Sequence, residues 1–515
     1  MEYAVQFKNI TKTFGSVAAN MDVTMNIKKG EILSLLGENG SGKTTLMNML
    51  SGIYYPDSGE IFINGVKTDI RSPKDAFSNG IGMIHQHFKL VDIFTASENT
   101  VLGLSDKKEK YDLNKTALMI KEICKKYGFN VDPYKKVYNM SVSEKQQLEI
   151  IKVLYRGASI LILDEPTAVL TPQETGKLFE VIRNMRNDGK SIIIITHKLH
   201  EVLTVSDRVA VLRKGEYIGT VNTKDATELS LTEMMVGKKV DLNIERPEPL
   251  NPEKRIEISH LSVKNSDGVQ VLKDVSFTVN GGEILGIAGI SGCGQKELLE
   301  SIAGLQHTEK GSSIIYYSSK ASEGEQLIGK NPKKICDLGV ALSFVPEDRL
   351  GMGLVGDMGM TGNMMLRSYG HGKSFFLDTK EPKNLANEVK EKLEVFTPSI
   401  NTPVRKLSGG NVQKVLVGRE IANSPKVLMT AYVVRGLDIN TSYVIYDLLN
   451  QQKKNGVAVI FVGEDLDVLL ALSDKILVLC GGQNNGLIDA RTTTKEQIGL
   501  LMTNMNNKGE AENAK

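Results

Sequence analysis

The first 35 residues alternate apolar and polar side chains, which is typical of strands in a small antiparallel layer. An apolar run from Glu31 to Leu36 then predicts a strand, and the spacing from Thr44 to Leu50 predicts a helix. Two aliphatic runs, Ile160–Leu163 and Ile192–Ile195, predict buried strands of a parallel sheet. The pattern therefore predicts an α/β fold with a mixed or parallel sheet core and a small antiparallel β layer.

Longer segments of the chain follow a helical period. Residues 95–140 show it from Leu113 to Ile123, and we expect them to form a helical insert. A further helix is expected to open near Met140 and to continue to about Tyr155. These segments predict a helical subdomain beside the sheet.

The second half of the chain repeats the first. Ser206-Asp207-Arg208 recurs as Ser473-Asp474-Lys475, an offset of 267 residues, whereas Gly37 matches Gly289 at an offset of 252. The second half therefore has about 15 extra residues between these points, and the chain is expected to contain two duplicated α/β domains.

A proline-rich stretch separates the two halves. Pro247, Pro249 and Pro252 lie among charged residues between Asp241 and Lys254, which is typical of a linker. The tail is rich in Asn, Lys and Glu and is expected to be disordered. The expected parts are domain 1 at 1–240, the linker at 241–254, domain 2 at 255–505 and the tail at 506–515.

Composition narrows the function classes. The 63 basic and 61 acidic residues nearly balance, so nothing indicates a nucleic-acid-binding surface. The four cysteines lie far apart and are expected to be ordinary thiols of a reducing compartment. The N-terminus shows no secretion signal, and no apolar run approaches the roughly 20 residues of a membrane span. We therefore expect a soluble chain whose role at a membrane would come through a partner.

One motif predicts phosphate binding. It follows the first predicted strand of the sheet, opens the helix from Thr44, and reads Gly37-Glu38-Asn39-Gly40-Ser41-Gly42-Lys43-Thr44-Thr45. The glycines allow backbone N–H groups to close around the β- and γ-phosphates at the helix N-terminus. Lys43 is expected to contact the β/γ oxygens, and the Thr44 hydroxyl is expected to bind Mg²⁺.

Further candidates stand at the ends of predicted strands, where ligands of open α/β sheets gather. Gln86 can offer its amide to Mg²⁺ or to the attacking water, although a turn residue is the plainer interpretation. Asp164 is expected to help hold Mg²⁺ and Glu165 to polarise water, against the alternative of a capping pair. His197 is a candidate for contact with the γ-phosphate. Phe14 is either a stacking surface for adenine or a core aromatic.

The matching positions of the second half lack these groups. Its loop is Gly289-Ile290-Ser291-Gly292-Cys293-Gly294-Gln295-Lys296-Glu297, in which Gln295 replaces Lys43 and Lys296 replaces Thr44. Ala431 and Tyr432 stand in place of the two carboxylates, and Glu464 replaces His197. Because several parts of phosphoryl transfer are missing together, we predict that this half does not hydrolyse ATP.

A second motif shows the opposite asymmetry. The second half contains Leu407-Ser408-Gly409-Gly410-Asn411-Val412-Gln413, whereas the first half has Ser141-Val142-Ser143-Glu144. Val142 and Ser143 thus place side chains where a close approach of backbone to phosphate favours glycine.

Taken together, these motifs resemble the ABC ATPases across about residues 1–505. The resemblance implies two tandem ABC-type P-loop ATPase domains that meet head to tail, with ATP between the phosphate loop of one and the signature of the other. It would place Ser408, Gly409, Gly410 and Gln413 opposite Lys43, Thr44, Gln86, Asp164, Glu165 and His197. The degenerate loop and the degenerate signature would then share the other site.

Twin domains with a damaged second half are similar to the ATP-binding subunits of sugar and nucleoside importers. The nucleoside branch is favoured by three segments: His85-Gln86-His87-Phe88-Lys89-Leu90-Val91-Asp92, Leu154-Tyr155-Arg156-Gly157 and Thr167-Ala168-Val169-Leu170-Thr171-Pro172-Gln173-Glu174. The segment Pro346-Glu347-Asp348-Arg349 matches the wider group and places Glu347 at the Q-loop position. The chain departs from the group at Ser143, usually glycine, and at Tyr432-Val433-Val434, usually Gln-Pro-Thr.

The resemblance implies ATP and Mg²⁺ as ligands, membrane permease subunits as partners and an extracellular solute-binding lipoprotein as an indirect one. It also implies a peripheral position at the cytoplasmic face of the cell membrane, with helical inserts after Gln86 and Glu347 contacting the permease. Two alternatives remain: a monosaccharide importer, and a soluble twin ABC ATPase acting on ribosomes or DNA.

Overall fold

The computed structural model divides the chain into two compact units, Met1–Asp241 and Leu242–Lys515. It describes all residues except 1, 16, 87, 105–111, 169, 238–242, 250–251, 266, 291, 319–322, 345–352, 367, 370–376, 423–424, 436 and 504–515, and only the backbone of 341–344. The Pro346–Arg349 segment with Glu347, and the tail at 506–515, therefore lie outside the described residues.

The predicted antiparallel layer of unit 1 is confirmed. Its strands follow the order β2-β1-β4-β5, and each neighbouring pair is antiparallel. The bounds are β1 Tyr3–Phe14, β2 Val17–Lys28, β4 Ser58–Ile63 and β5 Val66–Lys67.

The main sheet of unit 1 has the order β10-β9-β3-β8-β7-β6. Strands β9, β3, β8, β7 and β6 run parallel, and β10 is antiparallel to β9. The bounds are β3 Ile32–Leu36, β6 Ile81–Ile84, β7 Ile160–Asp164, β8 Ser191–Ile195, β9 Arg208–Arg213 and β10 Glu216–Asn222. Every residue of β3, β7 and β8 is buried, as their uninterrupted aliphatic runs predict.

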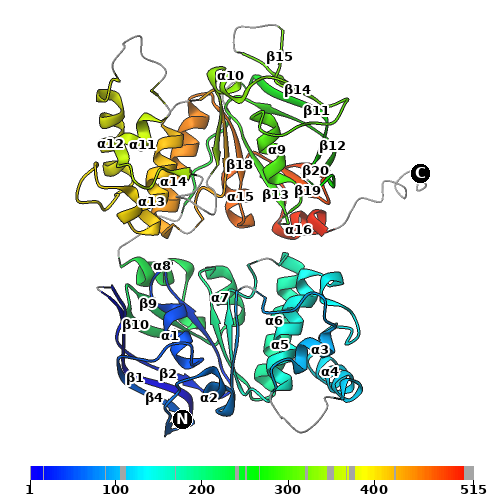
Figure 1. Ribbon diagram of the computed structural model, residues 1–515, viewed down its shortest axis with the longest axis vertical. Helices are drawn as coiled ribbons and strands as arrows, with labels where there is room; N and C mark the ends of the chain where they lie inside the picture. The colour runs from blue at the N-terminus through cyan, green and yellow to red at the C-terminus, as the bar shows by residue number, and fades with distance from the viewer. Residues whose placement is uncertain are drawn as a thin grey trace. The chain divides into compact units, whose positions relative to one another are not determined.

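Helices cover this sheet, and α3, α4 and α5 lie side by side (Figure 1). The bounds are α1 Lys43–Leu50, α2 Pro73–Ser78, α3 Ala96–Val101, α4 Leu113–Tyr127, α5 Val142–Tyr155, α6 Pro172–Asn187, α7 Leu199–Val205 and α8 Glu228–Val236, with 3-10 turns at Val137–Asn139 and Thr223–Asp225. The expected helical stretch to 140 was wrong beyond Tyr127, because Gly128 ends α4 in a left-handed conformation with φ 87°.

Unit 2 repeats both sheets. Their orders are β12-β11-β14-β15 and β16-β17-β18-β13-β19-β20. Taken from β20 to β16, the second order matches the main sheet of unit 1 strand for strand. The bounds are β11 Lys254–Lys264, β12 Gln270–Asn280, β13 Ile284–Gly289, β14 Ser313–Tyr316, β15 Glu325–Gln326, β16 Val340–Phe344, β17 Val427–Ala431, β18 Ala458–Val462, β19 Lys475–Cys480 and β20 Gln483–Asp489. The duplication inferred from the sequence offsets is thus confirmed.

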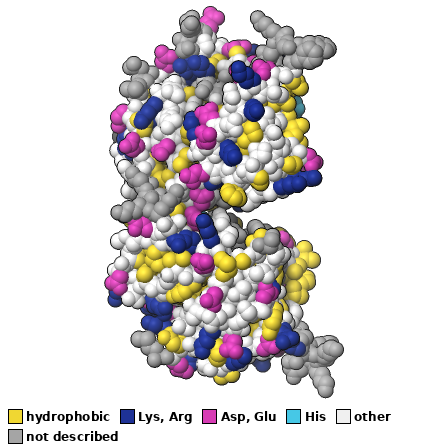
Figure 2. Space-filling view, turned by 90° about the vertical axis from the view of Figure 1, so that its left-hand side faces the viewer, with side chains coloured by type: hydrophobic (Ala, Val, Ile, Leu, Met, Phe, Trp, Pro, Cys, Tyr) yellow, Lys and Arg dark blue, Asp and Glu magenta, His cyan; other side chains and the backbone are white. Residues whose placement is uncertain are grey.

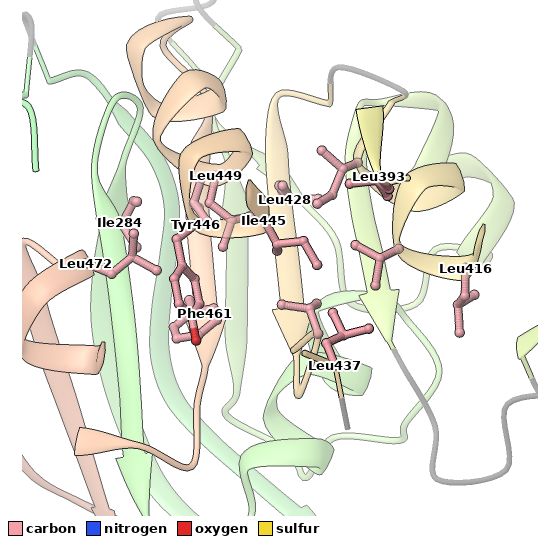
Figure 3. Packing of buried hydrophobic residues seen from close by; sticks show 14 of the residues in the cluster. Ile284, Leu393, Leu416, Leu428, Leu437, Ile445, Tyr446, Leu449, Phe461 and Leu472 are labelled. Carbon is pink, nitrogen blue, oxygen red and sulfur yellow. The ribbon is translucent and has the colours of Figure 1, made fainter. Parts of the chain in front are cut away.

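The helices of unit 2 follow the same plan. They are α9 Gln295–Ile302, α10 Pro332–Asp337, α11 Met360–Met365, α12 Lys380–Lys392, α13 Gly409–Ile421, α14 Ile439–Lys454, α15 Leu466–Leu472 and α16 Lys495–Thr503, with a 3-10 turn at Val404–Lys406. In the core, Tyr446 of α14 lies against Phe461 of β18, and the two aromatic rings meet edge to face with their centroids 6.4 Å apart (Figure 3).

The segment after the division belongs to the structure of unit 2. Arg246 donates to the carbonyl oxygens of Leu470 at 2.9 Å and Ser473 at 2.8 Å. Asn450 donates to Glu245 O at 2.5 Å, and the Lys453 ammonium contacts the Pro247 carbonyl. Residues 245–247 are therefore docked on unit 2.

The surface agrees with the balanced composition. Basic and acidic side chains are interspersed over the visible face of each unit (Figure 2). Within the described part of the chain, no helix is long and apolar enough to cross a membrane. The four cysteines are free thiols.

Candidate functional site

The carboxyl ends of four adjacent strands carry most of the candidates of unit 1. The phosphate loop leaves β3, Gln86 follows β6 by two residues, Asp164 ends β7, and His197 follows β8 by two residues. Because β3, β8, β7 and β6 are parallel neighbours in that order, these ends meet at one edge of the sheet. The sheet order, not the sequence order, brings the candidates together.

Glu165 is the centre of this group. Gln86 Nε2 donates to Glu165 Oε2 at 2.7 Å, and His197 Nδ1 lies 2.9 Å from Glu165 Oε1. The Glu165 backbone has φ 46°, and its N–H donates to Ile195 O at 2.9 Å. The hydrogen bond from His197 lowers the pKa of Glu165, with burial opposing it. The structure thus holds a charged carboxylate between an amide and an imidazole.

Lys43 is buried at the start of α1. Its Nζ donates to Gly37 O at 2.7 Å and to Glu38 O at 2.9 Å. Burial lowers its pKa to about 8, while the charges of Glu165 and Asp164 favour the ammonium. An ammonium has three N–H donors, so one beyond these two is available to a phosphate oxygen.

The rest of the motif forms the cradle. Gly37, Glu38, Asn39, Gly40, Ser41 and Gly42 make the loop, and Thr44 and Thr45 follow Lys43 in the first turn of α1. Gly42 has φ 95°, and a Cβ there would lie 2.2 Å from Ala19 O, so no larger residue fits. Ser41 Oγ is buried without a hydrogen-bond partner among the described residues. An orphaned hydroxyl inside a glycine cradle fits a phosphate group.

Asp164 supplies a second carboxylate. Burial, and then the charge of Glu165, raises its pKa to about 6. A desolvated carboxylate beside another one is relieved by a bound cation. Within the described ranges, no three His, Cys, Asp or Glu side chains gather as a metal site. Asp164, the exposed Thr44 hydroxyl and the Gln86 amide instead fit Mg²⁺, which binds few protein oxygens and completes its shell with phosphate and water.

Phe14 is not a core residue. It ends β1 with 45% of its surface exposed. Its ring meets Tyr54 edge to face at a centroid distance of 5.2 Å, and Lys12 Nζ lies 5.6 Å from its centroid. An exposed aromatic face fits the stacking interpretation. Sequence spacing did not identify Tyr54.

The signature candidates lie in unit 2, around the N-terminus of α13. Ser408 is the N-cap and makes no capping hydrogen bond to the helix backbone. Gly409 and Gly410 form the first turn, and a Cβ at Gly410 would meet nothing within 4 Å. Gln413 is fully buried, and neither amide atom has a partner in the described structure.

The matching helix of unit 1 is closed by its own side chains. Ser141 Oγ accepts from Glu144 N at 3.2 Å, and Glu144 Oε2 accepts from Ser141 N at 2.7 Å. Lys135 Nζ contacts both Glu144 oxygens, at 2.8 and 2.9 Å. This capping box places a carboxylate where a phosphate would bind. Its signal in the sequence is Ser-x-x-Glu before an apolar period, which was missed.

The chain is similar to known proteins along nearly its whole length. A family model described as ABC transporter matches residues 21–168 and 272–430. The chain is 41% identical to the nucleoside import ATP-binding protein NupA of Lactococcus lactis over 98% of this chain and 99% of that protein. It is 40% identical to the guanosine import ATP-binding protein NupO of Bacillus subtilis, over 98% of each.

A further relative is similar in sequence, and a solved structure is similar in fold alone. The glucose import ATP-binding protein TsgD13 of Haloferax volcanii is 37% identical over 97% of this chain and 95% of that protein. A chain from the crystal structure of archaeal ribosome recycling factor aABCE1 with ribosomal stalk protein aP1 superposes with TM-score 0.57, covering 91% of this chain and 87% of that one. At 17% identity it shows the fold alone. From its two matched segments and its near full-length relatives, the chain belongs to the ABC transporter family and carries two tandem ATP-binding cassettes.

Proposed function

We propose that this chain is the ATP-hydrolysing motor of an ABC importer whose cargo is a nucleoside. The observation that carries the ATPase part is the Glu165 carboxylate, held by Gln86 and His197 at the sheet edge that also bears Lys43. The similarity to NupA and NupO supports the cargo class. ATP is the substrate, and Mg²⁺ is its expected companion ion.

Each residue of the unit 1 site has a role in this proposal. Lys43 and the loop N–H groups bind the β- and γ-phosphates, and Thr44, Asp164 and Gln86 hold Mg²⁺. When bound, Mg²⁺ neutralises phosphate charge. Glu165 takes a proton from the attacking water as general base. His197 orients the Glu165 carboxylate through Nδ1 and offers its other ring nitrogen to the γ-phosphate.

The second cassette contributes in two ways. Ser408, Gly409, Gly410 and Gln413 complete the site of Lys43 and Glu165 when the cassettes close. The loop of Gln295 and the self-capped helix of Ser141 make the second site, which does not hydrolyse ATP. The Ser408 side chain, which makes no capping hydrogen bond, and the orphaned Gln413 amide support the first assignment.

The proposed partners are membrane permease subunits, which the chain binds at the cytoplasmic face of the membrane, and a solute-binding lipoprotein that acts indirectly. The helical insert containing α3 and α4 is the proposed contact with the permease. The names of the similar import ATP-binding proteins support the permease as a partner.

ATP hydrolysis by the purified full chain tests the motor. The Glu165→Gln chain should bind ATP and Mg²⁺ as tightly as the unmodified chain but hydrolyse it at least about a hundredfold more slowly. Hydrolysis at the unmodified rate by this chain would reject the assignment of Glu165.

Uptake by cells tests the cargo. Cells that depend on this chain should take up labelled guanosine, and uptake should disappear with Glu165→Gln. Uptake of labelled glucose or ribose in place of guanosine would favour the monosaccharide alternative, which the 37% identical glucose import protein supports. If Glu165→Gln abolishes the uptake of neither guanosine nor the sugars, the importer proposal is refuted.

A further inference from the structure

A buried clasp on α5 holds the main chain just after Gln86. The Lys89 N–H donates to Glu149 Oε1 at 2.6 Å, and Lys152 Nζ donates to the Lys89 carbonyl oxygen at 3.0 Å. Lys152 Nζ also lies 3.2 Å from Glu149 Oε2. The Glu149 and Lys152 side chains are only 8% and 12% exposed, whereas Lys89 itself is exposed. Both backbone groups of Lys89 are thus fixed by one helix.

The same helix also fixes the strand that leads to Gln86. Val153 of α5 packs on Gly82 of β6, where a Cβ would lie 2.0 Å from Val153 Cγ1. Ile84, the last residue of β6, belongs to the core cluster that α5 shares. Ile84 and Lys89 are therefore both anchored on α5, and Gln86 lies between these two anchors along the chain.

Placing the Glu149–Lys152 ion pair in this buried position costs free energy. Burying two charges costs free energy that their attraction repays only when further hydrogen bonds satisfy them, and apolar residues often do as well. Burial lowers the pKa of Lys152, which is the sign of this cost. Unit 2 confirms that the fold does not need the carboxylate, because Leu416 occupies the place of Glu149 on α13.

Unit 2 keeps only part of this device. Arg419, at the place of Lys152, donates to the Gly353 carbonyl oxygen at 2.9 Å and pairs with Glu420 at 2.6 Å. A cation on this helix holds a carbonyl in both units. Among the described residues, the carboxylate that accepts from this main-chain N–H, Glu149, is present in the cassette that carries Glu165, and the other cassette has Leu416 at that place.

We propose that Glu149 and Lys152 are positioning residues for Gln86, which keep its amide within reach of Mg²⁺ and of Glu165. The inference rests on the proposed role of Gln86 in the ATP site. Neither residue touches the substrate. Their loss should act through Gln86 alone, by letting the segment that carries it drift from α5.

The test measures steady-state ATP hydrolysis by the full chain while Mg²⁺ is varied. Glu149→Ala should lower kcat and raise the half-saturating Mg²⁺ concentration, each by about tenfold, because small misplacements in an active site have effects of this order. Glu149→Gln keeps an oxygen for the Lys89 N–H and should recover part of the loss. Glu180→Ala, which removes an exposed carboxylate of α6, is the matched control and should change neither quantity.

The same variants combined with Gln86→Ala decide the mechanism. In the Gln86→Ala chain, Glu149→Ala should cause no further loss, because the residue it positions is gone. Multiplying losses in the double variant would overturn the proposal, as would unchanged kinetics of Glu149→Ala. Thermal unfolding monitors folding, and Lys152→Met replaces Glu149→Ala if that chain does not fold. If Gln86→Ala alone hydrolyses ATP normally, the proposed role of Gln86 fails instead.

Discussion

The two phosphate loops share the left-handed glycine that precedes the helix and differ in their chemistry. Gly42 and Gly294 both have φ 95°, and a Cβ would collide with β2 at Gly42 and with β12 at Gly294. Gln295 occupies the place of Lys43, and its Nε2 donates to Ile290 O at 3.2 Å, as Lys43 Nζ does to Glu38 O at 2.9 Å. Packing and loop shape survive in unit 2, whereas the positive charge does not.

The residue after β7 in unit 1 and the residue after β17 in unit 2 also share a backbone conformation and differ in chemistry. Glu165 and Tyr432 both have positive φ, 46° and 56°. Their N–H groups donate to the carbonyl oxygens of Ile195 and Val462, at 2.9 and 3.1 Å. Because Tyr432 keeps the strained backbone without a carboxylate, this conformation belongs to the fold and is not by itself a sign of catalysis.

The helix N-termini reverse the asymmetry. The N-terminus of α5 is satisfied by Glu144, which stands where α13 has Asn411. In α13 the Asn411 amide donates to Ser408 Oγ at 2.8 Å and leaves no carboxylate at this end of the helix. The phosphate loop that carries an ammonium thus lies in unit 1, whereas the helix start without a carboxylate lies in unit 2.

The largest expected effect separates the two loops. Lys43→Met should reduce ATP hydrolysis by a factor on the order of 10² to 10³, because it removes a preorganised charge from the phosphates. Gln295→Met, the matched change in unit 2, should leave hydrolysis within about twofold, because that loop already lacks the charge. Steady-state ATPase assays of both full chains provide the measurement, and equal losses would break the comparison.

The two units also carry an ion pair at matching places, Arg186–Asp207 and Lys453–Asp474, and we expect the two pairs to contribute differently to stability. Lys453 and Asp474 are 1% and 2% exposed, whereas Arg186 and Asp207 are 32% and 37% exposed. Lys453→Met should lower the free energy of unfolding by about 3 kcal/mol, because it leaves the buried Asp474 carboxylate without its ammonium partner. Arg186→Met should cost about 1 kcal/mol or less. Denaturant unfolding of both chains measures this, and a larger loss for Arg186→Met would contradict the burial argument.

Phe14 offers a smaller effect on binding. Phe14→Ala should weaken ATP affinity by roughly 5- to 100-fold, as expected for the loss of one stacked base. Val17→Ala on the same hairpin removes another exposed apolar side chain and should not change affinity. Equilibrium binding of a fluorescent ATP analogue compares the two. An unaltered affinity in Phe14→Ala would return Phe14 to a purely structural role.

The smallest effect separates stability from function at the signature. Gly410→Ala adds a methyl group that meets nothing within 4 Å, and should leave stability unchanged or raise it by up to about 1 kcal/mol. It should nevertheless slow ATP hydrolysis about fivefold, because backbone and phosphate could no longer approach closely. Ser143→Ala at the matching place of unit 1 should be silent. Thermal unfolding and ATPase assays together decide this, and a silent Gly410→Ala would remove α13 from the site.

Much of this arrangement could be predicted locally. Aliphatic runs identified β7 and β8, alternation identified the layer of β1 and β2, and two offsets revealed the duplication. Carboxylate and imidazole side chains directly after buried strands, as at Glu165 and His197, indicated the candidate site. These signals are local because each depends on a run of neighbouring residues. The non-helical stretch after Gly128 was missed, since one left-handed glycine outweighed the helical period around it.

Only the tertiary structure decided which of these residues meet. The sequence determined the glycine cradle, the carboxylates and their loss in the second half. It did not determine that Gln86 and His197 both reach Glu165, or that Glu149 and Lys152 hold Lys89. These contacts join strands and helices far apart along the chain, and the order of strands in the sheet and the packing of α5 set them.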